Sequence, residues 1–410
     1  MVGTMAKIDD SVKKKVPELR FKGFTDEWEE RKLKDIAQFN PKTVLPDEFE
    51  YVDLESVVGT EMVSHRTESK GQAPSRAQRL AQKGDVFYQT VRPYQMNNYL
   101  YDLPYDNYVF STGYAQMRPN IDSHFLLNSV QNKQFVQHVL DRSTGTSYPA
   151  INSSDLSNIE IHVPSKLSEQ EKIGSFFKQL DDTIALHQRK LDLLKEQKKG
   201  YLQKMFPKNG AKVPELRFAG FADDWEERKL GELSNIVGGG TPSTSNPEYW
   251  DGDIDWYAPA EIGEQSYVSK SKKTITELGL KKSSARILPV GTVLFTSRAG
   301  IGNTAILAKE ATTNQGFQSI VPVQNKLDSY FIFSRTNELK RYGEVTGAGS
   351  TFVEVSGKQM SKMSIMVPEL SEQQKIGSFF KQLDDTIALH QRKLDLLKEQ
   401  KKGFLQKMFV

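Results

Sequence analysis

The chain has 410 residues, of which 37% are hydrophobic, and a formal net charge of +3. This length exceeds the usual size of one domain, so we expect two or more globular units, each with its own core. Cysteine is absent, which excludes disulfides, thiolate metal sites and thiol nucleophiles. No run approaches the ~18 apolar residues of a membrane span, and the start, MVGTMAKIDDSVKKK, has no apolar core. We therefore predict a cytoplasmic protein without a membrane partner.

Two blocks of sequence occur twice and organise the whole chain. KVPELRFKGFTDEWEERKLKDI at 15–36 returns as KVPELRFAGFADDWEERKLGEL at 212–233. A longer block at 167–206 returns at 370–409, differing only at Glu171/Gln374 and Tyr201/Phe404. Repeats of this kind indicate duplicated structural units. The chain therefore consists of a leading block, a divergent segment and a long helix, followed by the same three parts again.

The divergent segments, residues 37–166 and 234–369, are called the first and second heads below. KGDVFY, STGYAQMRP and GTSYPAINSSDLSNIEIHVP in the first lie over VGTVLF, NQGFQSIVP and GSTFVEVSGKQMSKMSIMVP in the second, in the same order. Each run is rich in β-formers, with Gly or Pro at its edges. We predict one mixed α/β (α+β) fold for both heads. The predicted division is 1–166 for the first globular domain, 167–209 for a central long helix, 210–369 for the second domain and 370–410 for a C-terminal long helix.

The duplicated helix carries apolar residues at an alternating spacing of four and three, which is the seam of a coiled coil. The predicted seam residues are Ile173, Phe177, Leu180, Ile184, Leu191 and Leu194 in the first copy, and Ile376, Phe380, Leu383, Ile387, Leu394 and Leu397 in the second. His187 and His390 fall on the seam, where we interpret them as tolerated polar positions that help to set register. Ser168 with Glu171, and Ser371 with Gln374, resemble capping boxes that would begin each helix.

Two identical seams in one chain most simply pack against each other. We predict antiparallel packing, because parallel helices would require the second head to carry the chain back along the full length of the rod. The result would be a pseudo-two-fold arrangement of two similar heads. Such a protein suits a target with its own two-fold symmetry, such as duplex DNA. The symmetry alone equally allows a scaffold that bridges two copies of a partner protein.

The net charge of each head argues against indiscriminate DNA binding. The first head holds 11 Lys and Arg against 14 Asp and Glu, and the second holds 14 against 13, so neither is basic overall. Each nevertheless has a basic segment just before the matched GDV or GTV strand, where phosphate contacts are predicted. These residues are Arg66, Lys70, Arg76, Arg79 and Lys83 in the first head, and Lys270, Lys272, Lys273, Lys281, Lys282 and Arg286 in the second. A solvated charged loop is the alternative interpretation of either segment.

Polar loops follow the matched strand in both heads. Arg can pair with guanine edges, and Asn or Gln with adenine edges, so these loops are candidates for direct base contact. The candidates are Arg92, Gln95, Asn97 and Asn98 in the first head, and Ser297, Arg298 and Asn303 in the second. The loops differ between heads, as two readers of different sequences would require. Ordinary polar loop chemistry is the alternative.

Catalytic patterns are weak throughout the sequence. Asp47, Glu68 and Lys70 formally match a PD…ExK nuclease pattern, in which the two carboxylates would hold a metal ion. Glu-x-Lys recurs elsewhere and the second head has no counterpart, so we interpret the match as coincidence. The Gly-rich runs complete no phosphate-binding motif, and the histidines lack metal-ligand spacing. We predict no catalytic residue and no metal site.

At this point the chain resembles the specificity (S) subunits of Type I restriction-modification systems. The similar residues are VPELRFKGFTDEWEERKL before the first head, with three substitutions before the second, GGGTPSTSNPEYWDGDIDW at 238–256, GTVLFTSRAGIGNTAIL, NQGFQSIVP, and LSEQEKIGSFFKQLDDTIALHQRKL at the start of the first long helix, with one substitution in the second. They cover nearly the whole chain. The first head departs from the pattern, since it lacks the GGTPS opening and carries YPAINSSDL where the second has FVEVSGKQM.

The resemblance implies a subunit without catalytic activity, in which each head reads one half of a split double-stranded DNA target and the paired helices fix the gap. It implies two methyltransferase (M) subunits docked on the chain, and restriction (R) subunits in the full complex. S-adenosylmethionine, ATP and Mg would belong to those partners, with no cofactor in this chain. We expect exposed helix residues, including Lys178, Arg189, Lys190 and Lys195, to contribute to docking. A scaffold that does not bind DNA and an accessory metal-dependent nuclease stay open as alternatives.

Overall fold

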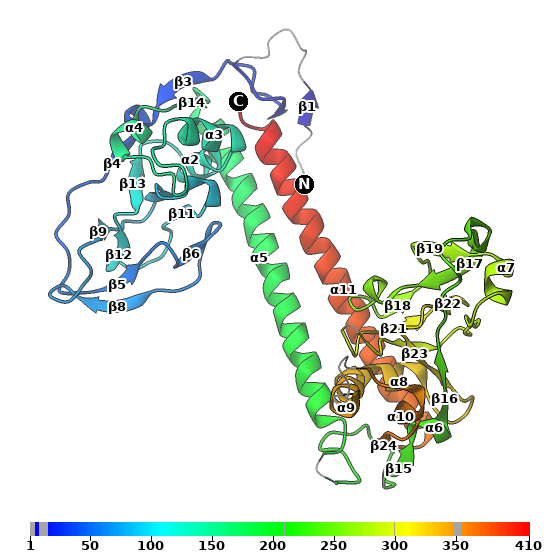
Figure 1. Cartoon of the computed structure of the whole chain (residues 1–410). Coiled ribbons are helices and arrows are strands. Elements are labelled where there is room, and N and C mark those ends of the chain that lie inside the picture. Colours follow the sequence, from blue (N-terminus) through cyan, green and yellow to red (C-terminus); the bar gives the residue numbers. More distant parts are fainter. Residues whose placement is uncertain (1–4, 8–14, 209, 299, 348–353) are drawn as a thin grey trace. The chain divides into compact units, whose positions relative to one another are not determined.

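The computed structural model describes residues 5–7, 15–208, 210–298, 300–347 and 354–410 (Figure 1). The chain divides into two compact units, residues 1–188 with 392–410, and residues 189–391. The two long helices are α5 (Leu167–Lys204) and α11 (Leu370–Lys407). Each unit therefore contains one head, its leading block and one half of each long helix. The two predicted long helices are confirmed, each spanning 38 residues, and they continue through Gly200 and Gly403.

In unit 1, two four-stranded sheets and short helices form the first head. The strand orders are β11-β10-β13-β4 and β8-β5-β12-β9, and β3 pairs with β14, β6 with β7 and β1 with β2. The elements are β1 (Met5–Lys7), β2 (Leu19–Phe21), β3 (Glu29–Lys32), α1 (Leu33–Ile36), β4 (Ala37–Phe39), β5 (Glu48–Val52), β6 (Val57–Val58), β7 (Glu61–Met62), β8 (Arg66–Ser69), β9 (Ala77–Leu80), β10 (Val86–Gln89), η2 (Pro93–Gln95), β11 (Tyr99–Leu100), β12 (Tyr108–Ser111), β13 (Tyr114–Pro119), α2 (Ser123–Val130), α3 (Lys133–Asp141), α4 (Ser153–Ser157) and β14 (Glu160–Val163).

Unit 2 repeats this plan. Its sheets have the orders β16-β23-β20-β21-β18 and β19-β17-β22, and β15 pairs with β24. The elements are β15 (Glu226–Lys229), α6 (Leu230–Leu233), β16 (Ser234–Gly238), η3 (Pro247–Tyr249), β17 (Trp250–Tyr257), η4 (Pro259–Glu261), β18 (Tyr267–Val268), β19 (Lys273–Ile275), α7 (Glu277–Lys281), β20 (Val293–Phe295), β21 (Thr304–Leu307), β22 (Thr312–Thr313), β23 (Gln318–Pro322), α8 (Ser329–Ser334), α9 (Thr336–Gly347), α10 (Gly357–Ser361) and β24 (Ser364–Val367).

The matched sequence runs occupy equivalent strands, so the predicted common fold is confirmed. GDVFY forms β10 and GTVLF forms β20, and each pairs antiparallel with the strand of the next matched run, β13 or β23. One parallel pair also recurs in the second sheet of each unit, β5 with β12 in unit 1 and β17 with β22 in unit 2. The two heads therefore share a topology although their surface residues differ.

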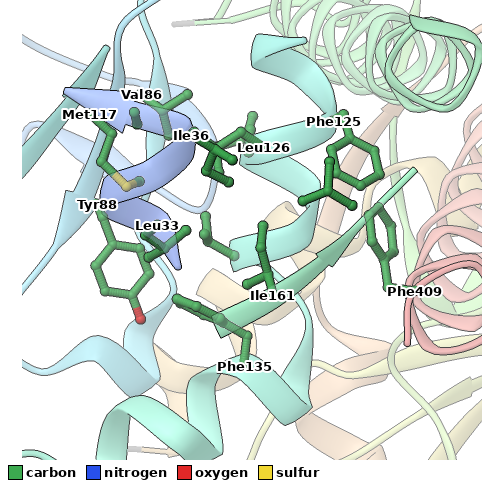
Figure 2. Close-up of a cluster of buried hydrophobic side chains, with 14 of the residues drawn as sticks. Leu33, Ile36, Val86, Tyr88, Met117, Phe125, Leu126, Phe135, Ile161 and Phe409 are labelled. Carbon is green, nitrogen blue, oxygen red and sulfur yellow. The ribbon is translucent and has the colours of Figure 1, made fainter. Parts of the chain in front are cut away.

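The core of unit 1 joins the head, its leading block and the long helices (Figure 2). Leu33, Phe125 and Phe177 are fully buried in it, and Trp28 of the leading block packs edge-on against Phe125 with ring centroids 5.7 Å apart. Phe409, just beyond α11, packs against the same Trp28 at 6.4 Å. Burying rings of this size contributes on the order of 2–3 kcal/mol each. Unit 2 repeats these contacts, since Trp225 lies 5.8 Å from Phe331 and 6.1 Å from Phe206. The repeated blocks therefore attach both heads to the helices in the same way.

The predicted antiparallel coiled coil is confirmed within each unit. In unit 1, Phe176 of α5 meets Phe404 of α11 edge-on at 5.0 Å, and Lys401 Nζ lies 2.6 Å from an Asp181 carboxylate oxygen. Unit 2 repeats this with the helices exchanged, through Tyr201 and Phe379 at 5.0 Å and Lys198 and Asp384 at 2.5 Å. All twelve predicted seam residues are buried or half-buried: Ile173, Phe177, Leu180, Ile184, Leu191, Leu194, Ile376, Phe380, Leu383, Ile387, Leu394 and Leu397.

A buried ion pair fastens each leading block to the start of a long helix. Arg20 donates two hydrogen bonds to the Glu169 carboxylate, at 2.6 and 2.7 Å, and both side chains are nearly inaccessible. Arg217 makes the same bidentate pair with Glu372 at 2.8 and 2.7 Å. A paired guanidinium and carboxylate satisfy each other where water cannot. The duplicated sequence therefore preserves a buried charge pair as well as apolar packing.

The predicted capping boxes are wrong. The helices begin at Leu167 and Leu370, one residue before the serines that were predicted to cap them, so Ser168 and Ser371 lie inside the first turn. The Ser371 hydroxyl donates to the Glu369 carboxylate instead of capping the helix. The start of α5 is held by the Gln170 side chain, which donates to the Pro164 carbonyl at 2.9 Å and accepts from the Asp122 N–H of the head at 3.2 Å.

Candidate nucleic-acid interface

Arg79 and Arg286 occupy equivalent positions in the two heads. Two residues after Arg79, the Ala81 N–H donates to Tyr108 O at 2.8 Å, and two residues after Arg286, the Leu288 N–H donates to Ala311 O at 2.8 Å. These acceptors mark the same edge of equivalent sheets. Arg79 and Arg286 are therefore equivalent in three dimensions, in agreement with the matched GDV and GTV runs that follow them in the sequence.

The Arg79 guanidinium is partly buried without a carboxylate partner. Burial lowers its pKa, and its Nε is buried with no acceptor among the residues that the structure describes. A half-buried cation without a counter-charge favours an anion from outside the chain. Arg286 is exposed and forms no ion pair within the described ranges. Both arginines thus present charge that a phosphate could neutralise.

The remaining cations of the first basic segment differ in availability. Arg66 is held by Asp53 at 2.7 Å and by Glu68 at 2.8 Å, and Lys83 lies 3.1 Å from Asp102. Lys70 and Arg76 are exposed on the loop between β8 and β9. Two of the five cations are therefore neutralised by their own head, and Lys70, Arg76 and Arg79 are the best candidates of this segment for phosphate contact.

The second basic segment is more open. All six of its cations are exposed, and in the described part of the chain none of them forms an ion pair: Lys270, Lys272, Lys273, Lys281, Lys282 and Arg286. Lys273 Nζ lies 5.5 Å from the centre of the Trp250 ring, a cation–π contact that leaves its charge uncancelled. The second head therefore offers the stronger positive surface.

In the first head, the predicted base-contact loop has an unusual backbone. Arg92 and Met96 have φ angles of 55° and 57°, a left-handed conformation that non-glycine residues rarely adopt, and they flank η2. Tyr94 at the tip is 49% exposed. Arg92 stacks over Tyr148 at 4.5 Å, and the side-chain oxygen Oε1 of Gln95 accepts from Gln89 Nε2 at 2.8 Å. The loop is thus held in one shape with an aromatic ring and a guanidinium at its surface.

Two asparagines predicted to contact bases instead support this loop. Asn98 is 1% exposed and accepts a hydrogen bond from the Gln89 N–H at 2.8 Å. Asn97 accepts from the Gly59 N–H at 2.8 Å. The assignment of Asn98 as a base contact is wrong, because its side chain is buried. Sequence reasoning also missed Tyr94 and Tyr148, although RPYQM, with a proline fixing the turn before an aromatic residue, was a signal for the first.

The corresponding loop of the second head needs a similar correction. Ser297 is fully buried, and its hydroxyl donates to the Gly316 carbonyl at 3.1 Å, so it cannot contact a base in this conformation. Arg298 is half-buried and Asn303 is exposed, so both stay candidates. Gly300 and Gly302, which lie between Arg298 and Asn303, have φ angles of +100° and +96°. Glycine supplies here the turn that the first head builds from strained residues.

The GGGTPS opening of the second head has a packing role. A Cβ on Gly239 would lie 1.9 Å from Asn314 O, and one on Gly240 would lie 2.3 Å from Ala285 N. The Gly240 carbonyl accepts a hydrogen bond from Trp256 Nε1 at 2.8 Å. These glycines let the opening strand pass close to its neighbours, and the first head, which lacks them, opens through Asn40 at φ 46°.

The nuclease pattern does not assemble a metal site. The Lys70 N–H donates to the Asp47 carbonyl at 2.8 Å, while the Glu68 carboxylate is occupied by Arg66. Over the described residues, no group of three or more His, Asp or Glu side chains could hold a metal ion. In that same part of the chain, no helix is long and apolar enough to cross a membrane.

The protein thus belongs to a class with two heads of the same fold. The polar loops differ between the heads, and each head is attached to an antiparallel pair of long helices. The family model of the Type I restriction modification DNA specificity domain matches residues 25–196 and 222–399. The chain therefore belongs to this family.

Relatives with curated names agree with this assignment. The MjaIX specificity subunit of Methanocaldococcus jannaschii is 37% identical over 179 residues, which cover 43% of this chain and 41% of that protein, so the match spans less than half of the relative. The HindI specificity subunit of Haemophilus influenzae is 20% identical over 420 residues, covering 83% of this chain and 90% of that protein.

Solved structures share the fold. A Type I restriction-modification S subunit from M. genitalium superposes with a TM-score of 0.66 and 16% identity, covering 96% of this chain and 99% of that one. A chain from a study of complex assembly and conformational transition in a type I R-M system gives a TM-score of 0.52 at 23% identity, covering 93% and 97%. The predicted architecture is thus confirmed.

Proposed function

We propose that this chain is the specificity subunit of a Type I restriction-modification complex and reads a split double-stranded DNA target. Each head would read one half, and the paired helices would set the gap between halves. The observation that carries the proposal is the equivalence of Arg79 and Arg286 on a shared topology whose base-facing loops differ. Equivalent phosphate contacts position both heads alike, and unlike loops allow different bases to be read.

Specific candidates follow for each kind of contact. Lys70, Arg76 and Arg79, with the six cations of the second basic segment, would contact phosphates. Arg92, Gln95, Arg298 and Asn303, with the ring of Tyr94, would contact bases. Arg66 and Lys83 are weaker candidates, since neighbouring carboxylates already neutralise them.

We infer further that the long helices dock two methyltransferase subunits. Leu186, Leu193, Leu389 and Leu396 lie outside the seam and are between 51% and 61% exposed, at the same heptad position of both copies. Exposed leucines repeated every seven residues favour a helical partner. Arg189, Lys190 and Lys195 are exposed beside them, whereas Lys178 is engaged by Asp102 at 3.2 Å.

Catalysis would then belong to the partners. The methyltransferase subunits would carry S-adenosylmethionine, and restriction subunits would supply ATP- and Mg-dependent cleavage, leaving this chain as a recognition subunit. The competing function, a scaffold that never binds DNA, shares the helices but gives no role to the unpaired cations of both heads.

Mapping of methylated adenine across a genome tests the proposal. The chain and its methyltransferase subunit would be expressed in a host without adenine methylation, with and without exchange of residues 234–369 for the second head of another family member. We expect a split motif of which only one half changes after the exchange. A motif in which both halves change, or methylation without a split motif, would contradict two independent readers.

A further inference from the structure

The sheet of the first head that contains β10 has one strand fewer than its counterpart in the second head, which contains β20. In the second head, β18 runs parallel beside β21 and forms the edge of the sheet, with Tyr267 opposite Ile306. In the first head, the equivalent edge is β11, and no strand of the described residues lies beside it. The same fold therefore ends one strand earlier.

The hydrogen bonds establish which residues correspond. The Leu307 N–H donates at 2.9 Å to the carbonyl of Thr292, the residue that follows the matched glycine Gly291. In the same way, the Tyr101 N–H donates at 2.9 Å to the carbonyl of Asp85, the residue that follows Gly84. Tyr101 and Leu307 are therefore equivalent. It follows that Leu100 corresponds to Ile306 and Asp102 to Ala308.

The backbone N–H groups at these two positions, which face away from the sheet, have hydrogen-bond acceptors in the second head only. The N–H of Ile306 donates to Ser266 O at 2.8 Å, and the N–H of Ala308 donates to Val268 O at 2.9 Å. Over the residues that the structure describes, neither the Leu100 N–H nor the Asp102 N–H has an acceptor. Two backbone donors spaced two residues apart on a sheet edge are a template for one more strand.

A groove lies beside this edge, within unit 1. Its volume is about 540 Å³, and its walls are Leu100 and Asp102, the tip of the β6–β7 hairpin, and the face of α5 that includes Lys178 and Ala185. Gly59 in that tip is held by Asn97, so the wall is anchored. His124 lines the groove as well.

The second head shows what fills the equivalent space. Tyr267 of β18 places its ring 6.0 Å from the ring of Tyr330 and 5.7 Å from Lys381 Nζ. His124 stands where Tyr330 does, since each follows a serine whose hydroxyl donates to the carbonyl of the matched glycine, Gly84 or Gly291. The first head thus keeps a place for an aromatic side chain that its own sequence does not supply.

We propose that an extended segment of the methyltransferase subunit adds to β11 as a parallel strand. It accepts hydrogen bonds from the N–H groups of Leu100 and Asp102, and an aromatic side chain between the two acceptor residues enters the groove beside His124. This rests on the proposed function, because a subunit docked on α5 already borders the groove. Strand addition of this kind takes its affinity from backbone bonds and its specificity from side-chain pockets.

Other occupants fit less well. Lys178 and Lys401 of the groove are paired with Asp102 and Asp181, and Glu61 and Asp182 line it together with Lys398. The groove therefore offers the phosphates of a nucleic acid little positive charge that is not already cancelled. In a second copy of this chain, β18 is already paired with its own β21 and is not available. A protein segment from the partner on the helices satisfies both constraints.

Hydrogen exchange of the free chain and of its complex with the methyltransferase subunit tests the proposal. We expect the amides of Leu100 and Asp102 to exchange rapidly in the free chain and at least about tenfold more slowly in the complex. The amides of Ile306 and Ala308 serve as an internal control, slow in both samples. A complex that protects α5 while Leu100 and Asp102 still exchange rapidly would overturn the added strand alone. Failure to form any complex would instead refute the docking in the proposed function.

Substitution at Asp102 gives an independent readout. D102P removes the N–H donor and the carboxylate, whereas D102A removes only the carboxylate, so their difference isolates the backbone bond. We expect D102P to bind the methyltransferase subunit about two- to tenfold more weakly than D102A, the effect of one hydrogen bond. H124Y, which installs the residue of the second head, should tighten binding. Equal affinities for D102P and D102A would refute the proposal.

Discussion

The buried pair of Arg20 and Glu169 gives the most decisive test of how each head is attached. Both side chains are at most 4% exposed and share two hydrogen bonds of 2.6 and 2.7 Å. E169Q keeps the shape of the side chain but removes its charge, leaving a buried guanidinium without a counter-ion. Breaking one partner of such a pair costs about 3–5 kcal/mol. In a unit of roughly 200 residues, this lowers the midpoint of thermal unfolding by about 6–20 °C.

The second unit supplies a matched comparison. Arg217 is more exposed, at 14%, and also donates to the Asp223 carbonyl at 2.8 Å. E372Q should therefore destabilise unit 2 less than E169Q destabilises unit 1, and E171Q, on the exposed face of α5, should have little effect. Thermal unfolding followed by circular dichroism, with hydrogen exchange to assign each transition, measures all three. If E169Q lowered stability no more than E171Q, the buried pair would not be what fastens the leading block.

Three further predictions concern the heads. R79E combined with R286E should abolish binding to duplex DNA in a titration at physiological salt, while each single change weakens it; unchanged binding would favour the scaffold. G240A should destabilise unit 2 by about 1–3 kcal/mol in denaturant unfolding, because its Cβ would lie 2.3 Å from Ala285 N. G238A is the control, since its nearest neighbours would be 3.7 Å away. Burial, and then Lys178, lowers the pKa of His124. The unfolded imidazole takes up its proton first, near pH 6.5, so unit 1 should lose stability as the pH falls below about 6.5, and H124Q should remove that part of the pH dependence.

Much of the fold was predictable because its signals are local or periodic. The four-three spacing specified the seam, and identical helices favoured the antiparallel pairing that Asp181 and Lys401 confirm. The matched GDV and GTV runs predicted equivalent strands, because glycine-bounded β-rich runs keep their order when a fold is duplicated. The start of each helix was less predictable, since the contacts that fix it, such as Gln170 to Pro164, combine local spacing with packing against the head.

The same holds for the candidate site residues, whose types are known from the sequence but whose burial and ion pairing are not. Residue type alone proposed Asn98 and Ser297 as base contacts, and only the packing of the loops showed that both are buried. Likewise, the sequence places Arg66 and Arg286 in equivalent basic segments. The structure neutralises Arg66 with Asp53 and Glu68 but leaves Arg286 exposed.

The amino-acid sequence by itself determined the duplicated plan of this protein, because periodicity and repetition are properties of the chain. Which side chains are free to act, and which sheet edge is left open at Leu100 and Asp102, was decided only by the tertiary structure. Burial, ion pairing and strand addition depend on neighbours that are distant in sequence, such as Asp53 for Arg66 or Ser266 for Ile306.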